Sequence, residues 1–277
     1  MCIRDSMKKA RGSAIDNDAY QFIRVDYEET LAWLMINRPR VHNAMNSDCI
    51  LEMTMALETL EADPFIRVIS IIGAGEKAFT SGADISEIKE FTGIEMEPYN
   101  RRWINLFEKI ERLKKPVIAA VHGWATGGGT EMSLACDFVV CSSESRFGLA
   151  EINIGVIPGA GAAIRLTRWV GRLKAKEILM LGEQISGSEA AQIGLVNRCV
   201  PHDSLRDTVK EISSALSEKA PLALAAAKAS VNSAAESHQT TAIEHELNEF
   251  LRLFWTQDQK EGMRAFLEKR KPKFIGK

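Results

Sequence analysis

Two glutamates beside glycine-rich turns are the residues in this chain best suited to chemistry. Glu131 follows three consecutive glycines in "TGGGTE", and Glu151 precedes the apolar residues and glycines of "INIGVIPGAG". A carboxyl group in apolar surroundings has a raised pKa, because its charged form is poorly solvated there. Two such groups around one water can hold opposite protonation states and act as acid and base. Taken alone, the same residues also fit an ordinary turn and a solvated helix residue.

The two turns "FTSGADI" (residues 79–85) and "TGGGTE" (residues 126–131) each follow a buried, strand-like run. Their small residues leave backbone N–H groups accessible, and N–H groups at a helix start carry partial positive charge. Two convergent N–H donors form an oxyanion hole, which stabilises negative charge on a carbonyl oxygen. The glycines also let a ligand carbonyl approach the backbone closely. The pair of turns therefore indicates a site for a polarised carbonyl.

Alternating strands and helices are predicted to position these turns. The strands are expected at residues 21–27, 31–38, 66–73, 116–123 and 136–142, and helices at residues 46–63 and 97–115. The first two strands are predicted to form a hairpin. The later alternation predicts mostly parallel pairing with helical crossovers, which is an α/β architecture.

The second half of the chain is expected to be largely helical. We divide the chain into a disordered tail or sequence artefact at residues 1–18, a core at 19–200 and a helical oligomerisation region at 201–277. Met7 opens "MKKARG", so residues 1–6 in particular are interpreted as an artefact. An amphipathic helical tail of this length must bury its apolar faces, and a partner subunit is a natural candidate.

Composition restricts the class of protein. The 277 residues carry 35 Lys and Arg against 37 Asp and Glu, a net charge of −2, which argues against a general nucleic-acid binder. No apolar run reaches the length of a membrane span. The five cysteines are scattered without a secretory signal, so buried free thiols in a reducing compartment are expected. We predict a cytoplasmic location, or the mitochondrial matrix in a eukaryote.

Several common catalytic motifs are missing from the sequence. "GAGEKAFT" lacks the spacing of a phosphate-binding loop, and no G-x-S-x-G nucleophile elbow is present. The "HELNE" stretch at His245 has no second histidine for zinc, and the other histidines are dispersed. No metal site is predicted.

The chain resembles the enoyl-CoA hydratase/isomerase, or crotonase, family over about residues 20–277. The resemblance rests on the order and spacing of "NRPRVHNAMN", "IIGAGEKAFTSGADI", "KKPVIAAVHGWATGGGTEMSLACDF", "FGLAEINIGVIPGAG", "RLTRWVG" and "GMRAFLEKRKPKF". It implies a spiral of ββα turns with a C-terminal helical trimerisation region. It also implies a homo-trimer or a hexamer built as a dimer of trimers.

The resemblance also implies a role for each matching residue. Ala83 and Gly128 would supply the oxyanion-hole N–H groups, and Glu131 and Glu151 would be the catalytic acids. The N–H of Gly159 would position the attacking water. The coenzyme A (CoA) contacts implied are Arg40, Val41, Asp84 and Ile85, together with Phe266 and Lys269 acting mainly on CoA bound to a neighbouring subunit.

The activity implied is reversible addition of water to a trans-2-enoyl-CoA, giving a 3-hydroxyacyl-CoA. No cofactor is expected, because coenzyme A is part of the acyl-CoA substrate. Alternatives are an enoyl-CoA isomerase or another acyl-CoA-processing member of the family. A different class of function is a non-catalytic RNA-binding or scaffold protein, which the near-neutral charge argues against. Acyl chain length, branching and physiological direction stay open.

Three residues depart from the pattern of many hydratases. Ser86 stands where a lysine is common after "GADI", and Lys89 is a candidate replacement one turn later. Ala150 replaces a proline before the second glutamate, and Ala162 replaces a glycine. The first change concerns a CoA phosphate contact and the other two concern the acyl pocket, so no catalytic group is lost.

Overall fold

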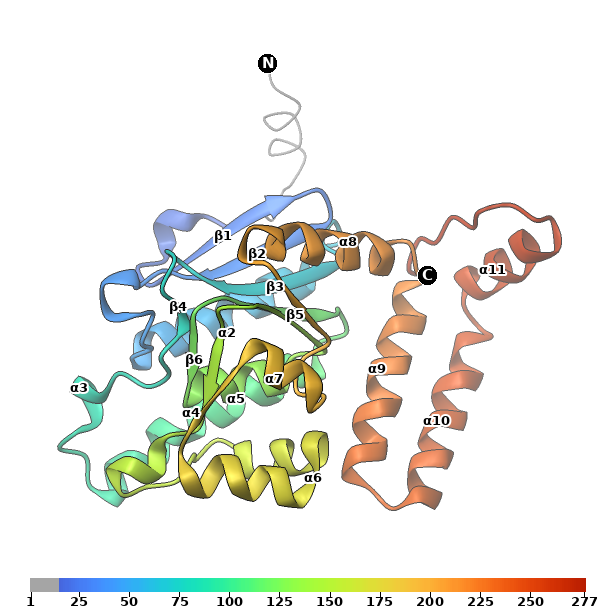
Figure 1. Ribbon diagram of the computed structural model, residues 1–277. Helices are drawn as coiled ribbons and strands as arrows, with labels where there is room; N and C mark the ends of the chain where they lie inside the picture. The colour runs from blue at the N-terminus through green and yellow to red at the C-terminus, as the bar shows by residue number, and fades with distance from the viewer. Residues whose placement is uncertain (1–14) are drawn as a thin grey trace.

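Two β-sheets form the centre of the molecule in the computed structural model, which describes residues 15–277 (Figure 1). The strands of the larger sheet, in spatial order, are β1 (Ile23–Glu28), β2 (Leu31–Ile36), β3 (Val68–Gly73), β5 (Val117–Val121), β7 (Phe138–Ser142) and β10 (Arg198–Val200). β1 and β2 form the expected antiparallel hairpin, and every other neighbouring pair in this sheet is parallel. The predicted α/β architecture is confirmed.

The second sheet consists of three-residue strands. In spatial order they are β4 (Ala78–Thr80), β6 (Trp124–Thr126), β8 (Arg146–Gly148) and β9 (Gln184–Ser186). From β3 onward, the chain repeatedly passes from a strand of the larger sheet to a strand of the smaller one and then into a helix. This repetition produces the spiral of ββα turns. Sequence patterns did not reveal these short strands, because three residues are too few to show a hydrophobic period.

Helices cover the sheets and close each turn of the spiral (Figure 1). In the core they are α2 (Ser47–Ala62), α3 (Ile85–Ile88), α4 (Gly93–Arg112), α5 (Gly128–Ala135), α6 (Ala162–Leu181), α7 (Gly187–Gln192) and α8 (Leu205–Ser217). Residues 15–277 also contain four short 3-10 helices: η1 (Asn17–Ala19), η2 (Pro39–Val41), η3 (Glu151–Ile154) and η4 (His202–Ser204). The predicted start of α2 is confirmed, since the Asn46 side chain accepts a hydrogen bond from the Cys49 N–H.

Three helices extend from the core as a C-terminal arm: α9 (Pro221–Glu236), α10 (Gln239–Leu253) and α11 (Gln257–Leu267). α9 and α10 run side by side next to the core, and α10 buries none of its own residues in the single chain (Figure 1). An ion pair joins α9 to the core: the Lys228 ammonium lies 2.8 Å from the Asp137 carboxylate. No helix within residues 15–277 is long and apolar enough to cross a membrane.

The N-terminal boundary differs from the one expected at residue 19. Residues 1–14 lie outside the described part of the chain. The Asn17 side chain, however, pairs with both backbone groups of Val25, accepting from its N–H at 2.7 Å and donating to its carbonyl at 2.9 Å. Ile15 packs against the core and donates its N–H to the Tyr27 hydroxyl. The packed chain therefore begins by Ile15.

The cysteines within the described residues are free, as expected. Cys49, Cys136 and Cys141 are buried and Cys199 is half-buried. Burial raises the pKa of the Cys49 thiol to about 12, so this thiol is protonated and unreactive at neutral pH. The fifth cysteine, Cys2, lies outside the described residues.

Candidate active site

Three consecutive glycines at the start of α5 each make room for a different neighbour. A Cβ on Gly127 would lie 2.9 Å from Glu151 Oε1, and Gly127 also has a φ of +52°. A Cβ on Gly128 would lie 2.9 Å from the Trp103 indole, and one on Gly129 would lie 2.3 Å from the Thr80 carbonyl oxygen. The glycine run thus lets α5 approach the second glutamate, α4 and β4 at once.

The close approach of Trp103 changes one expectation from the sequence. The glycines were expected to leave space for a ligand carbonyl. At Gly128, the space that a side chain would fill is already occupied by the buried Trp103 ring. Access of a ligand to the Gly128 N–H therefore depends on the other side of the backbone.

A buried threonine fixes the first turn of α5. The Thr130 hydroxyl shares its one hydrogen between the carbonyl oxygens of Ala125 and Gly148, at 2.7 and 3.1 Å, and accepts from the Gly148 N–H. These bonds tie α5 to β6 and β8. Glu131 follows in the same turn and is only 4% exposed. It is therefore not a solvated helix residue, which the sequence alone had left open.

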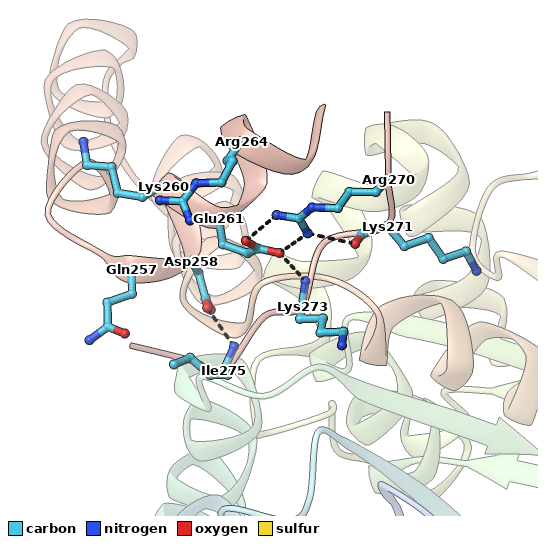
Figure 2. A pocket seen from close by; sticks show the side chains of 9 residues that line it. All are labelled: Gln257, Asp258, Lys260, Glu261, Arg264, Arg270, Lys271, Lys273 and Ile275. Atoms are coloured by element: carbon cyan, nitrogen blue, oxygen red, sulfur yellow. Dashed lines mark hydrogen bonds and ion pairs between the residues drawn. The ribbon is translucent and has the colours of Figure 1, made fainter. Parts of the chain in front are cut away.

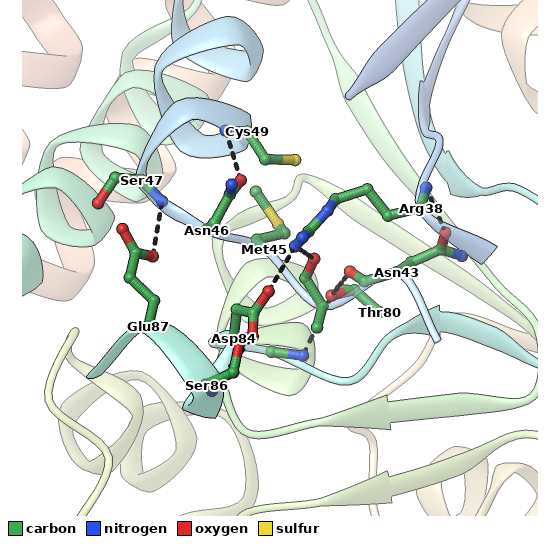
Figure 3. A network of polar contacts seen from close by, with 12 residues as sticks. Arg38, Asn43, Met45, Asn46, Ser47, Cys49, Thr80, Asp84, Ser86 and Glu87 are labelled. Atoms are coloured by element: carbon green, nitrogen blue, oxygen red, sulfur yellow. Dashed lines mark hydrogen bonds and ion pairs between the residues drawn. The ribbon is translucent and has the colours of Figure 1, made fainter. Parts of the chain in front are cut away.

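The loop that carries Ala83 is held by the segment after β2 (Figure 3). The Met45 N–H donates to the Gly82 carbonyl at 2.8 Å, and the Asp84 N–H donates to the Met45 carbonyl at 3.0 Å. The Arg38 guanidinium contacts both the Asp84 carboxylate, at 3.0 Å, and the Ala44 carbonyl. This network fixes the backbone on both sides of Ala83.

Asp84 is engaged within the protein. Hydrogen bonds from Ser86 and the adjacent Arg38 guanidinium hold the pKa of the Asp84 carboxyl below its usual value. Ser86, the departure from the common lysine, thus takes part in fixing this loop. The Asp84 backbone is engaged as well, since the N–H donates to Met45 and the carbonyl accepts the Glu87 N–H at 3.0 Å. The predicted CoA contact of Asp84 stays a prediction.

Ala83 and Gly128 present two unpaired N–H groups beside each other. Within residues 15–277 neither backbone N–H donates a hydrogen bond, although most buried N–H groups in proteins are paired. Their loops touch: a Cβ on Gly82 would lie 2.8 Å from the Gly128 nitrogen, and Thr126 donates its hydroxyl to the Ser81 carbonyl. The arrangement can bind one carbonyl oxygen or another small anionic group.

Glu131 is held by the glycine-rich turn that precedes α6. Its Oε1 accepts the N–H of Ala160 at 3.0 Å and the N–H of Ala162 at 3.1 Å. Burial, aided by the nearby Glu151 charge, raises the pKa of the Glu131 carboxyl to about 7, although the two N–H bonds oppose the rise. A carboxyl with this pKa can give and take a proton at neutral pH.

Glu151 opens η3 and turns toward the first turn of α5. Its Oε2 is buried without a hydrogen-bond partner in the described residues, while its Oε1 lies against Gly127. Burial raises the pKa of this carboxyl as well. An unpaired buried carboxyl oxygen is costly, so this atom points to a ligand or water as its partner.

The raised pKa of Glu131 predicts a pH-dependent loss of stability. The Glu131 carboxyl has a pKa of about 7 in the folded protein and its usual 4.5 in the unfolded chain. The folded protein therefore binds more protons between these pH values, and the free energy of unfolding falls as the pH rises through them. Above about pH 7, ionised Glu131 lowers the free energy of unfolding by about 3 kcal/mol. Glu131→Gln removes this effect and keeps a hydrogen-bond acceptor. Thermal melts at about pH 5 and pH 8 should show the Gln variant gaining stability relative to the wild type at the higher pH. An unchanged difference would contradict the burial argument.

Gly159 directly precedes Ala160, one of the two residues whose N–H groups bind Glu131. Its carbonyl accepts the Asn100 side-chain N–H at 2.8 Å, and a Cβ at this position would collide with that amide at 2.2 Å. The glycine therefore joins the turn before α6 to α4. Its own N–H makes no hydrogen bond within the described residues, so its predicted role with water stays a prediction.

The predicted CoA contacts fall into two separate groups. Arg40, Val41 and Ile85 are exposed near the Ala83 loop. Phe266, which is 83% exposed, and Lys269 lie in and after α11, on the opposite side of the molecule from α3 (Figure 1). One chain therefore does not bring all the predicted CoA contacts together.

The segment after α11 is folded back by two carboxylates (Figure 2). Glu261 makes two contacts with the Arg270 guanidinium, at 2.7 and 2.9 Å. Asp258 accepts the N–H groups of Ile275 and Gly276, at 2.7 and 2.8 Å. These bonds leave the basic residues of the segment exposed around an otherwise ordered turn.

Several contacts of the site are not visible in local sequence patterns. They involve the N–H groups of Ala160 and Ala162, the Trp103 ring, and the Arg165–Glu111 ion pair behind the turn. Only the glycine-rich character of "IPGAG" pointed to this turn. These contacts join residues about 25 to 55 positions apart, so local sequence patterns do not contain them.

Two acids with raised pKa values lie beside two unpaired N–H groups on a ββα spiral. This is an arrangement for acid–base chemistry on a polarised carbonyl compound. The comparison with known families agrees with this class. The chain belongs to the enoyl-CoA hydratase/isomerase family, whose model matches residues 26–277.

Curated relatives and solved structures cover nearly the whole chain. The crotonyl-CoA hydratase of Syntrophomonas wolfei is 41% identical over 94% of this chain and 100% of its own length. The short-chain-enoyl-CoA hydratase of Clostridium acetobutylicum is 41% identical over 89% of this chain and 95% of its own. A crystal structure of an enoyl-CoA hydratase from Bacillus anthracis superposes with a TM-score of 0.89 at 35% identity, covering 93% of this chain and all of the other. The fold is therefore the crotonase fold.

Proposed function

We propose that this protein is an enoyl-CoA hydratase that adds water reversibly to a short trans-2-enoyl-CoA. The observation that carries the proposal is the pair of glutamates beside the unpaired N–H groups of Ala83 and Gly128. Glu131 is buried, and Glu151 is half-buried with its Oε2 buried and unpaired within the described residues. Relatives named crotonyl-CoA hydratase and short-chain-enoyl-CoA hydratase support both the reaction and the short acyl group.

The N–H groups of Ala83 and Gly128 bind the thioester carbonyl oxygen in this proposal. They stabilise the negative charge that develops there as water adds to C3. Each donor contributes roughly 3 kcal/mol to the transition state, judging by the effect of removing such donors from other enzymes. Because they are backbone groups in fixed loops, they need no rearrangement during the reaction.

Glu131 and Glu151 hold the reacting water between them. One carboxylate accepts a proton from the water while the oxygen of the water bonds to C3. The other carboxyl group, in its protonated form, delivers a proton to C2. The product contains both hydrogens and the oxygen of one water, and the reverse reaction uses the same groups. Hydration changes no overall oxidation state of the substrate and water taken together, so we propose no redox cofactor. We propose that the two N–H groups polarise the carbonyl, so that the reaction needs no metal.

The CoA part of the substrate lies along Arg40, Val41 and Ile85 in this proposal. Phe266 and Lys269 contact CoA bound to a neighbouring subunit, since α11 lies on the opposite side of its own chain from α3 (Figure 1). The exposed basic residues after α11 suit the phosphate groups of CoA.

A panel of trans-2-enoyl-CoA substrates tests the proposed activity. Purified protein should hydrate crotonyl-CoA, measured by the loss of absorbance of the conjugated enoyl thioester, with lower kcat/KM for chains of about eight to ten carbons. We base this preference on the short-chain relatives. Absence of hydration with every substrate in the panel, in a folded protein, would refute the proposed function.

We also propose a trimer or a hexamer. The C-terminal arm exposes many large apolar side chains, which is unusual for a monomeric protein. They include Ile243, Leu247, Phe250, Leu251, Trp255, Met263, Phe266 and Leu267. Light scattering at micromolar concentration should give three or six times the 30.7 kDa mass of one chain. A monomer under these conditions would contradict this proposal without bearing on the chemistry of the site.

A further inference from the structure

An arginine on α6 lies directly behind the turn that holds Glu131. The Arg165 guanidinium forms a two-point ion pair with Glu111 of α4, with Nε–Oε1 at 2.6 Å and Nη2–Oε2 at 2.8 Å. Both side chains are largely shielded from solvent, at 14% and 25% exposed. The guanidinium also lies 5.7 Å from the centre of the Phe107 ring. These contacts fix Arg165 in one orientation, because a planar two-point pair restricts the side chain far more than a point contact does.

The remaining nitrogen of Arg165 contacts the backbone of the turn. Its Nη1 donates to the Ala160 carbonyl oxygen at 2.8 Å. That carbonyl belongs to the Ala160–Gly161 peptide. The peptides on either side of it supply the Ala160 and Ala162 N–H groups that bind Glu131 Oε1. Arg165 therefore holds the middle one of three successive peptides whose outer two bind the glutamate.

Gly161 is adapted to this contact. It has a φ of +101°, and a Cβ there would lie 2.5 Å from Arg165 Nη1. A side chain at this position would both strain the backbone and displace the guanidinium. The turn is thus shaped around the arginine as well as around the glutamate.

We propose that Arg165, held by Glu111, is a positioning residue that fixes the Glu131 carboxylate for acid–base chemistry through the backbone of residues 160–162. This inference rests on the proposed hydratase function for its kinetic consequences. Arg165 acts through the turn and does not itself contact the carboxylate in the structure.

The charge of Arg165 has a second effect on Glu131. A nearby cation favours the ionised form of a carboxyl group, and Arg165 accordingly lowers the pKa of Glu131 against the larger effect of burial. Loss of this charge raises the pKa of Glu131, so a higher pH is then needed to ionise it. The acid limb of the pH profile therefore moves upward. A role limited to uncharged packing of α6 against α4 predicts no such movement.

Four variants separate the contact from the charge. Arg165→Gln removes the two-point pair and the charge, whereas Arg165→Lys keeps a charge and loses the planar fork. Glu111→Gln weakens the hold on Arg165 from the other side. Arg168→Gln is the matched control, since Arg168 is exposed on the same helix and its side chain makes no hydrogen bond or ion pair among those described.

Kinetics with crotonyl-CoA give the first readout. Arg165→Gln and Arg165→Lys should each lower kcat by about 10- to 100-fold, with KM changed by less than about 2-fold, because a displaced catalytic group affects the chemical step. The kcat of Glu111→Gln should lie between the kcat of these variants and that of the wild type. Arg168→Gln should match the wild type. Wild-type kcat in a folded Arg165→Gln protein would overturn the inference, and a circular-dichroism melt establishes folding.

Titration of Glu131 gives a readout that does not depend on turnover. The carboxyl carbon of ¹³C-labelled glutamate is followed by NMR against pH, and its signal is assigned by its loss in Glu131→Gln. The midpoint should rise by about half a pH unit or more in Arg165→Gln and less in Arg165→Lys. An unmoved midpoint in Arg165→Gln would overturn the inference. If the wild type fails to hydrate any enoyl-CoA, the proposed function falls while this titration still decides the role of Arg165.

Discussion

Glu131→Gln and Glu151→Gln are each expected to lower kcat for crotonyl-CoA hydration by at least about 10²-fold. General acid–base assistance typically supplies about 10²–10⁴-fold, and here both carboxyl groups act on one water. Gln retains the size of Glu and an oxygen for the Ala160 and Ala162 N–H groups, but it cannot transfer a proton. Affinity for the CoA thioester should change little, because neither carboxylate is among the proposed CoA contacts. Steady-state kinetics together with equilibrium binding of a non-reactive acyl-CoA measure both quantities.

The double variant distinguishes a paired mechanism from two independent effects. If the glutamates act as a unit, combining the substitutions costs far less than the product of the two single losses. An isomerase predicts a different pattern, in which one glutamate moves the proton and the other can be replaced while conversion of 3-enoyl-CoA to 2-enoyl-CoA continues. Near-wild-type hydration by folded Glu131→Gln would show the two-carboxylate mechanism to be wrong.

Removing either oxyanion donor should lower kcat by about 10²–10³-fold. The proposed donors are backbone N–H groups, so the change must be made in the backbone. Replacing Ala83 by lactic acid, or Gly128 by glycolic acid, exchanges one N–H for an ester oxygen and leaves the side chain unchanged. A conventional Gly128→Val variant is less informative, because its Cβ would lie 2.9 Å from the Trp103 ring and disturb α4.

The same exchange at an exposed helix start is the control. The N–H of Ile94, in the first turn of α4, makes no hydrogen bond within the described residues, and its side chain is 87% exposed. An ester there should leave kcat and the melting temperature unchanged. If the esters at Ala83 and Gly128 also leave kcat unchanged, these N–H groups do not bind the reacting carbonyl, and another pair of donors must be sought.

The sequence specified the main helices and five strands of the larger sheet directly, but not the three-residue strand β10. Strands β3 and β5 are buried, largely apolar runs, and α2 begins at the Asn46 cap. Such features are local, because period, capping and chain-breaking residues act over a few neighbouring positions. The same local reading found the two glutamates and both glycine-rich loops, since apolar flanks and glycines are visible in the sequence itself.

The smaller sheet and the environment of the acids required the folded structure. β4, β6, β8 and β9 are strands of three residues each, and pairing between distant turns of the spiral, not propensity, makes them strands. Whether Glu131 is a solvated helix residue or a buried acid depends on Ala160 and Ala162, which donate to it from about 30 residues away.

The roles of the glycines in the site were also determined partly by the sequence and partly by the tertiary structure. The sequence determined that residues 127–129 have no side chains, and hence that something approaches the backbone there. Only the structure decided that Glu151, Trp103 and Thr80 are the groups that approach. Local patterns record what a residue permits, whereas its neighbours are set by burial and hydrogen bonding among segments that meet only when the spiral closes. For that reason the sequence by itself determined the type of chemistry, and the tertiary structure determined the geometry and the protonation of the groups proposed to perform it.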